Sequence, residues 1–353
     1  MKKWLILFGI LFAVCMPVYA EESPVLDGEE LFNETARQVV EGELTLNPVK
    51  LINMGFKKLF DEITQSREIL VSMLVIAAVS GILNAMQTSL GEGGVSETAF
   101  FACFTLMTAA VVRIFSLTLG YGVEVIHELS DFITKLAPMF TILMISGGAV
   151  TSAAVFNPVL SGAVYVITIV VDKCIVPLVY LGAVLGIVNN ISAKVQITKF
   201  NTLIRSLAKW ILTAVLTIFT SITAIYGFSA PVLDGVKMKA VKFAVGSLVP
   251  VVGGLLSDTV ETVLNGTRLV KNAAGVAGMV VVCGIALVPI MKIGVMILML
   301  KLAAAAIEPL TDKRMTDMVS DVTGSVVTIF AMVVTTAMLF IICIGIMVGA
   351  TNG

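Results

Sequence analysis

The sequence predicts an all-α polytopic membrane protein, and three observations lead to this prediction. Hydrophobic residues make up 58% of the 353 residues and charged residues only 13%, whereas an average soluble protein has about 25% charged residues. The mean hydropathy is +1.02. The apolar residues are gathered in long runs, and a run of about 20 residues crosses a bilayer as a helix. A soluble core could not bury this much apolar surface, so we expect the chain to lie in the lipid bilayer.

Composition and charge exclude several functional classes. Lys plus Arg number 23 and Asp plus Glu number 24, so the net charge is −1 and no basic field attracts a nucleic acid. The single histidine, His127, and five cysteines without a C-x-x-C pair argue against a metal site. The sequence contains no phosphate-binding loop, H-E-x-x-H motif or nucleophile elbow. We therefore expect no enzymatic activity, no cofactor and no metal.

Residues 1–20 are predicted to be a signal peptide. Two lysines follow Met1, residues 4–14 are apolar, and Val18-Tyr19-Ala20 offers small residues where signal peptidase cleaves. The apolar stretch is shorter than the about 20 residues of a membrane span. An uncleaved anchor is the alternative. We expect a bacterial membrane protein whose mature N-terminus is extracytoplasmic.

Residues 21–67 are the longest polar stretch and are predicted to form a short extracytoplasmic head. After Pro48, apolar and charged residues occupy opposite faces of a helical pattern, with Ile52, Phe56, Leu59, Phe60 and Ile63 on one face and Lys57, Lys58, Asp61 and Glu62 on the other. This pattern is typical of an amphipathic helix on a membrane surface or against a partner. A soluble lead-in to the first span is the alternative.

Residues 68–353 are predicted to form the transmembrane body, with about 7–9 membrane segments. Ordinary spans are predicted at Ile69 to Leu90, Thr98 to Gly120, Trp210 to Ala230 and Val322 to Gly349, with further segments at Leu136 to Phe156 and Phe243 to Leu256. Residues 123–136 have one apolar stripe, which predicts a second surface helix. His127 would then be a solvated interfacial residue rather than a ligand.

Two apolar runs are too long for one straight crossing. Val159 to Val188 would be about 45 Å long as a helix, against a hydrocarbon core of about 30 Å. Asp172, Lys173 and Pro177 interrupt it, and Pro289 and Lys292 interrupt the run from Val276 to Ile307. We expect re-entrant or broken elements, because a double crossing of the first run keeps the basic segment 194–209 in the cytoplasm.

The breaks also suggest an internal two-fold repeat. Pro138 and Pro177 are 39 residues apart, as are Pro250 and Pro289. The offset of 112 residues between the two pairs predicts repeats at 136–230 and 243–349. Paired helix breaks in two halves indicate a transport path or substrate site. The alternative is that Pro and Gly are simply commoner in membrane helices.

Ionisable residues within the apolar runs are the remaining functional candidates. A charge at bilayer depth costs at least about 2.5–3.5 kcal/mol, so it normally faces a cavity or a partner. Together with the helix-breaking residues, these charges give a set of candidate path-lining or hinge residues: Arg113, Asp172, Lys173, Pro177, Pro250, Gly253, Gly254, Asp258, Pro289 and Lys292.

The second half of the chain carries a family resemblance. The segment 248–254 reads Leu-Val-Pro-Val-Val-Gly-Gly and is followed by Asp258-Thr259 and by Leu269-Val270-Lys271-Asn272. Gly147-Gly148 and Phe156-Asn157-Pro158-Val159 add to the pattern. These residues resemble the stage III sporulation protein AE family over nearly the whole chain. The head is short for that family.

The resemblance implies a place in a secretion-like apparatus of endospore-forming bacteria. Members are polytopic proteins of the mother-cell membrane that surrounds the forespore. The implied partners are the other stage III sporulation A-operon proteins (the AA ATPase and AB to AH) and, across the intermembrane space, the stage II sporulation protein Q complex. The family has no established catalytic residues, so none are transferred.

Three functions are compatible with the sequence. The first is a channel- or export-gate-like component of this apparatus, required for forespore development. The second is a stand-alone secondary transporter of a small solute. The third is a non-conducting membrane scaffold for the apparatus. All three need the lipid bilayer, and none needs a nucleic acid.

Overall fold

The computed structural model describes residues 71–82, 95–191, 197–248 and 253–349, and the regular structure in these ranges is helical. The helices are α4 (Val95–Ser146), α5 (Val150–Val170), α6 (Val176–Ile191), α7 (Thr198–Leu248), α8 (Gly253–Ile307) and α9 (Lys313–Gly349). A π-helical turn, η1 (Val171–Ile175), joins α5 to α6. A shorter apolar helix, Val71–Ile82, precedes α4.

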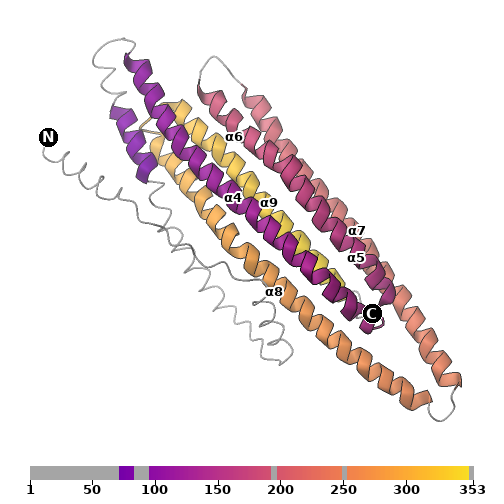
Figure 1. Cartoon of the computed structure of the whole chain (residues 1–353). Coiled ribbons are helices and arrows are strands. Elements are labelled where there is room, and N and C mark those ends of the chain that lie inside the picture. The colour runs from indigo at the N-terminus through magenta and orange to yellow at the C-terminus, as the bar shows by residue number, and fades with distance from the viewer. Residues whose placement is uncertain (1–70, 83–94, 192–196, 249–252, 350–353) are drawn as a thin grey trace.

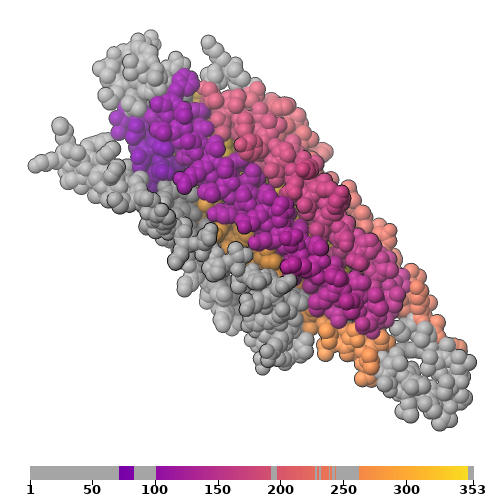
Figure 2. All heavy atoms as spheres, in the orientation of Figure 1, coloured from indigo at the N-terminus to yellow at the C-terminus, as the bar shows by residue number. Residues whose placement is uncertain are grey.

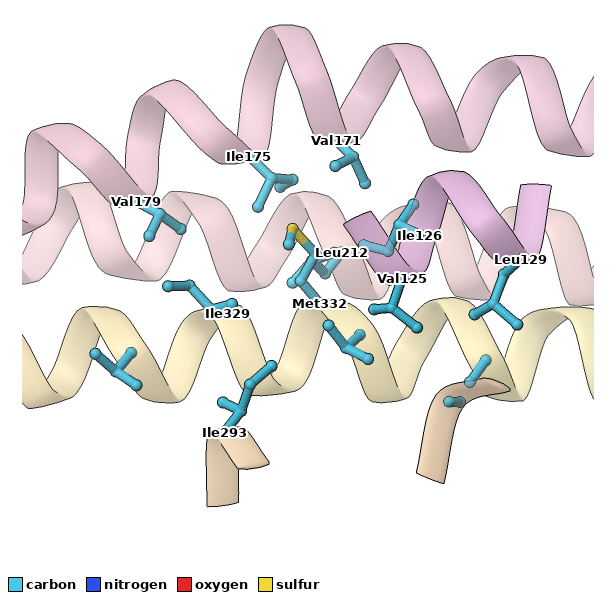
Figure 3. Close-up of a cluster of buried hydrophobic side chains, with 14 of the residues drawn as sticks. Val125, Ile126, Leu129, Val171, Ile175, Val179, Leu212, Ile293, Ile329 and Met332 are labelled. Atoms are coloured by element: carbon cyan, nitrogen blue, oxygen red, sulfur yellow. The ribbon is translucent and has the colours of Figure 1, made fainter. Parts of the chain in front are cut away.

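The long helices lie side by side in one elongated bundle, and helices that follow one another across a turn or connection are antiparallel (Figure 1). α9 is central, because it packs against α4, α6, α7 and α8. Figure 3 shows the apolar side chains that meet at this centre: Val125, Ile126 and Leu129 of α4, Val171 and Ile175 of η1, Val179 of α6, Leu212 of α7, Ile293 of α8, and Ile329 and Met332 of α9. The core is therefore formed between helices from side chains that recur at helical spacing.

Five segments of the described residues are long and apolar enough to cross a membrane: Phe101–Ser146, Val150–Ile191, Thr198–Tyr226, Thr262–Ile307 and Lys313–Val348. Large apolar side chains also cover the outside of the bundle, as Trp210 and Ile218 do on α7, where they are 77% and 61% exposed. These observations confirm the prediction of an all-α membrane protein. The described residues contain fewer long crossings than the predicted number, and the signal peptide and the head lie outside them.

The prediction of a surface helix at 123–136 is wrong. These residues continue α4 without interruption from Val95 to Ser146. Their apolar stripe is real, but it faces the core, where Ile126, Leu129 and Ile133 are buried. Gly122 permits this packing, because a Cβ at that position would lie 2.5 Å from Ile329 of α9. The stripe therefore packs on a helix and not on the membrane surface.

The prediction that residues 159–188 cross twice or re-enter is also wrong. α5, η1 and α6 follow one another as a single helical run from Val150 to Ile191. The N–H of Val176 donates to the carbonyl oxygen of Val171, five residues back. The hydrogen-bond ladder thus shifts just before Pro177, which has no N–H to donate. Residues 276–307 likewise belong to one helix, α8, which continues through Pro289.

Two other predicted membrane segments also have different boundaries in the structure. The expected segment 243–256 is not a crossing, because its described residues belong to the end of α7 and the start of α8. The expected segment 136–156 is divided by a turn at Gly148, whose φ of 80° lies in the left-handed region that glycine tolerates. In this turn the N–H of Ala149 donates to the carbonyl oxygen of Met144 at 2.8 Å, which closes α4 before α5 begins.

The helix order is compatible with the predicted repeat. The α5–α6 run lies in the first predicted repeat and α8 in the second. Each of these long segments is followed by a second antiparallel helix, α7 after α5–α6 and α9 after α8. The repeat itself stays a prediction.

Candidate functional site: a charged face of α4

The outer side of α4 carries a line of charged residues, which we call the charged face of α4: Arg113, Glu124, Glu128, Asp131 and Lys135. Spacings of three, four, seven and eleven residues place them on one side of an α-helix. Glu128 is half-buried and the other four are exposed. Figure 2 shows α4 along the outer surface of the bundle, beside α5 and α6. The charged face is therefore not part of the core.

The charged face lies beside the least polar part of α9. A Cβ at Gly122 would contact Ile329 and Met332 of α9, and a Cβ at Gly278 would contact both Leu136 of α4 and Ile344 of α9. Residues 122–136 of α4 thus lie next to α9 from about 329 to 344, within a stretch (322–349) that contains no Asp, Glu, Lys or Arg. Glu124, Glu128, Asp131 and Lys135 therefore lie along a segment of α9 that is apolar enough to cross a membrane, and at bilayer depth a charge exposed to lipid would be costly.

His127 and Asp172 join α4 to the π-helical turn at one edge of the charged face. His127 Nε2 lies 3.2 Å from Oδ1 and 3.3 Å from Oδ2 of Asp172. Both side chains are partly accessible, at 47% and 34%. Nearby, the hydroxyl oxygens of Ser130 in α4 and Thr168 in α5 are 3.5 Å apart. Asp172 therefore has a specific partner on another helix, and Lys173, beside it, is exposed.

Lys292 of α8 lies on another side of α4. Its Nζ is 5.2 Å from the centre of the Tyr121 ring, a cation–π distance. The lysine is half-buried, one turn after Pro289. Two of the ionisable residues predicted from sequence, Asp172 and Lys292, therefore contact α4 directly.

The remaining predicted site residues do not all join this group. Arg113 is on the charged face, and Pro177 is exposed at the start of α6. Gly253, Gly254 and Asp258 are in the first turns of α8, more than thirty residues, or about 50 Å along a helix, from Lys292. Pro250 lies outside the described residues. The segment 250–258 and the charges around α4 therefore form two separate regions.

Sequence reasoning missed most of the charged face. The sequence predicts a surface helix at the position of Glu124, Glu128, Asp131 and Lys135. On such a helix, water solvates charged side chains, and they need no functional explanation. The only sign in the sequence that these charges are not on a surface helix is that they lie between two apolar runs whose combined length exceeds one span. A second polar cluster, in which Arg205 of α7 contacts Asp321 of α9 at 2.9 Å, was missed because the two residues are far apart in sequence. Among the described residues, no three His, Cys, Asp or Glu side chains come together to hold a metal ion.

The bundle of long apolar helices and its charged face define a class: a polytopic α-helical membrane protein with a line of ionisable groups along one helix. The family model of stage III sporulation protein AE matches residues 31–351. The chain therefore belongs to the stage III sporulation protein AE family, as the resemblance predicted. It is 27% identical over 315 residues to stage III sporulation protein AE of Bacillus subtilis (strain 168), covering 89% of this chain and 79% of that protein. No solved structure matches the chain.

Proposed function

We propose that this protein is a non-enzymatic, channel- or export-gate-like membrane component of the sporulation apparatus, and that the charged face of α4 lines its aqueous path. Membership of the sporulation family supports the biological setting. The observation that carries the molecular role is the exposure of Glu124, Asp131 and Lys135 beside the charge-free part of α9. Such residues in membrane helices normally face water or a polar partner.

Neither lipid nor the same face of a second copy of the chain, packed without water, would stabilise these charges. Copies that share one orientation in the membrane would bring Glu124, Glu128 and Asp131 against their own equivalents across a symmetry axis. Two like charges 4 Å apart repel by about 4 kcal/mol at an effective dielectric constant of 20. Water solvates both signs of charge, which favours an aqueous path over a packed contact.

The proposed location is the mother-cell membrane around the forespore, with the mature N-terminus extracytoplasmic. The proposed partners are the other stage III sporulation A-operon proteins, including the AA ATPase, and the stage II sporulation protein Q complex. Because no motor motif occurs in the sequence, energy for transport would come from a partner. One chain presents an open face, so other chains would complete the wall of the path.

Cysteine accessibility tests this function. Glu124→Cys and Asp131→Cys are made in a chain whose native cysteines are replaced, and membranes from sporulating cells are treated with a charged thiol reagent. Such reagents attack the thiolate, which forms in water and not in lipid. Matched controls are Ile218→Cys, which is 61% exposed on the apolar side of α7, and Ile329→Cys, which is buried. We expect fast labelling at 124 and 131 and little at the controls.

The result also separates the alternative functions. Labelling of 124 and 131 no faster than at 218 would contradict an aqueous path and leave a membrane scaffold. Solute uptake by the purified protein alone in liposomes would instead indicate a stand-alone transporter. Labelling that blocks forespore development would support the path directly.

A further inference from the structure

The contact between His127 and Asp172 has features of a proton-binding site. His127 is the only histidine in the chain, and its Nε2 is within 3.3 Å of both carboxylate oxygens of Asp172. Histidine is the side chain whose charge ordinarily changes between pH 5 and 8. A protonated imidazole forms a charge-assisted bond to the carboxylate, and such bonds are roughly twice as strong as neutral ones.

The charges around His127 are mostly negative. On its own helix, Glu124 and Asp131 lie one turn away on either side, and Glu128 follows it directly. From η1 come Asp172 and, beside it, the cation Lys173. Among the other described segments that pack on α4, α5, α6 and residues 322–349 of α9 contain no Asp, Glu, Lys or Arg, whereas α8 contributes Lys292. Lys135 lies two turns further along α4, and Lys292 is at Tyr121.

The π-helical turn gives this contact a mechanical consequence. Asp172 is on the outer side of η1, whereas Val171 and Ile175 of the same turn are buried in the core (Figure 3). A π-helical turn is a local irregularity of the helix and often occurs at functional sites. A change in the strength of the His127–Asp172 contact therefore acts where α5 and α6 meet.

We propose that His127 and Asp172 form a proton-binding site that holds α4 against the α5–α6 helix when a proton is bound. Protonation of His127 gives an ion pair between the helices, and loss of the proton leaves a weaker hydrogen bond from the neutral imidazole to the carboxylate of Asp172. This site rests on the proposed function only because protons must reach the charged face of α4 from water. The helix contact itself is measured without any transport assay.

The test uses a disulfide between positions 130 and 168, whose hydroxyl oxygens are 3.5 Å apart. Ser130→Cys and Thr168→Cys are introduced in a chain without its native cysteines, in membrane vesicles, and the rate of disulfide formation is measured from pH 5.5 to 8. The same cysteine pair with His127→Gln is the matched control. Dividing the two rates at each pH removes the pH dependence of thiol chemistry, which both chains share.

We expect the ratio of the two rates to be about three- to tenfold higher at pH 5.5 than at pH 8. A tenfold change corresponds to about 1.4 kcal/mol, which is the free energy of one strong interaction. Adding Asp172→Asn should flatten the ratio. A ratio that stays constant with pH would overturn the proposal.

A second measurement covers the case in which the variants fold poorly. Because the chain has one histidine, selective isotope labelling gives a single histidine signal in the NMR spectrum of the unmodified protein. The proposal requires this signal to differ between pH 5.5 and pH 8, and a signal that does not change would also overturn it. Fast labelling at 124 and 131 with a flat ratio would remove the proton site alone. Slow labelling there would count against the aqueous path alone.

Discussion

Nη2 of Arg205 in α7 lies 2.9 Å from Oδ1 of Asp321 in α9. The Nδ2 group of Asn190 donates to the other carboxylate oxygen at 3.0 Å. The amide of Asn201, oriented to satisfy its neighbours, accepts from Arg205 at 2.7 Å and donates to the carbonyl oxygen of Gly182 at 3.0 Å. Three helices are joined by this network, and both charges are paired and hydrogen-bonded, as burial requires.

Replacing Arg205 should destabilise the bundle. Arg205→Met leaves the carboxylate of Asp321 without its cation, and breaking a fully buried pair costs about 3–5 kcal/mol. The two side chains are 20% and 22% exposed, so we expect a smaller loss, about 2 kcal/mol. Thermal unfolding of the detergent-solubilised protein measures it. Lys209→Met, at an exposed position of the same helix, is the matched control and should change stability by less than about 0.5 kcal/mol. Equal effects of the two substitutions would contradict the role of this network.

Two glycines in similar helices should respond oppositely to alanine. A Cβ at Gly186 would lie 2.8 Å from Cβ of Asp321, which is too close and involves an atom near the backbone. A Cβ at Gly162 would meet nothing within 4 Å. We expect Gly186→Ala to lower stability by about 1–3 kcal/mol, as overpacking does. Gly162→Ala should be neutral or stabilising by up to about 1 kcal/mol, because alanine favours the helix. The unfolding temperatures of the two variants provide the comparison, and a stabilised Gly186→Ala would show that α6 and α9 are less tightly packed.

The network also marks the limit of prediction from sequence. Helical spacing and composition predicted the membrane bundle, and rare charges in apolar runs pointed to Asp172 and Lys292. Arg205 was placed only in a basic amphipathic segment. Nothing in the chain order shows that α7 faces α9 at Asp321. Pairing between distant helices depends on how glycines such as Gly186 let them approach, and that is tertiary information.

Errors in the predicted segments have a common physical cause. The prediction assumes that a membrane helix is about as long as one bilayer crossing. It therefore divides apolar runs longer than one span at Pro177, at Pro289 or at the charged residues 124–135. The helices continue through all three places. Proline lacks one N–H, and a π-helical turn or a bend can absorb that loss. Charged residues likewise do not end a helix. They lie on the side of the helix that faces away from the apolar core.

Asp234 should stabilise the junction of α5 and α7 in a pH-dependent way. One of its carboxylate oxygens accepts from the N–H of Thr151, and the other accepts from the N–H and hydroxyl of Ser152, at 2.7–2.8 Å. Ala149, which precedes α5, offers no side-chain cap. Burial raises the pKa of Asp234, but the hydrogen bonds from Ser152 and Thr151 outweigh it and leave the pKa below its usual value.

The lowered pKa fixes the direction of the effect. The charged form is the one stabilised by folding, so its contribution is present at neutral pH and is lost as the pH falls below about 4. We expect Asp234→Ala to cost about 1–2 kcal/mol at pH 7, typical of a lost cap, and less near pH 3. Unfolding at both values tests this, with Asp317→Ala at an exposed site as the control. A difference that grows in acid would contradict the cap.

Lys271 should hold the end of α9 in place. Its side chain is buried, at 2% exposed, and its Nζ donates to the carbonyl oxygens of Val348 at 3.2 Å and Met347 at 3.4 Å. These carbonyls belong to the last turn of α9, where a helix favours a cation. We expect Lys271→Met, which keeps the length of the side chain, to lose about 1–3 kcal/mol, since hydrogen bonds of a charged group are lost. Limited proteolysis near the C-terminus and thermal unfolding measure the change, and unchanged protection of α9 would contradict this role.

The antiparallel order of the helices predicts on which side of the membrane each connection lies. α6 ends and α7 begins at one end of the bundle, where α8 also ends and α9 begins, whereas the turn 147–149, the end of α7 and the start of α8 are at the other end. Lys237 and Lys239 lie toward the second end, and more basic residues, Lys199, Lys209, Lys313 and Arg314, lie toward the first end. The positive-inside bias therefore predicts that this end is cytoplasmic. Reporter fusions at 194 and 310 should both show cytoplasmic activity, and fusions at 148 and 251 should both show extracytoplasmic activity. Fusions at 194 and 310 on opposite sides would contradict the helix order, because only α7 and α8 separate them, and one of these two helices would have to fail to cross.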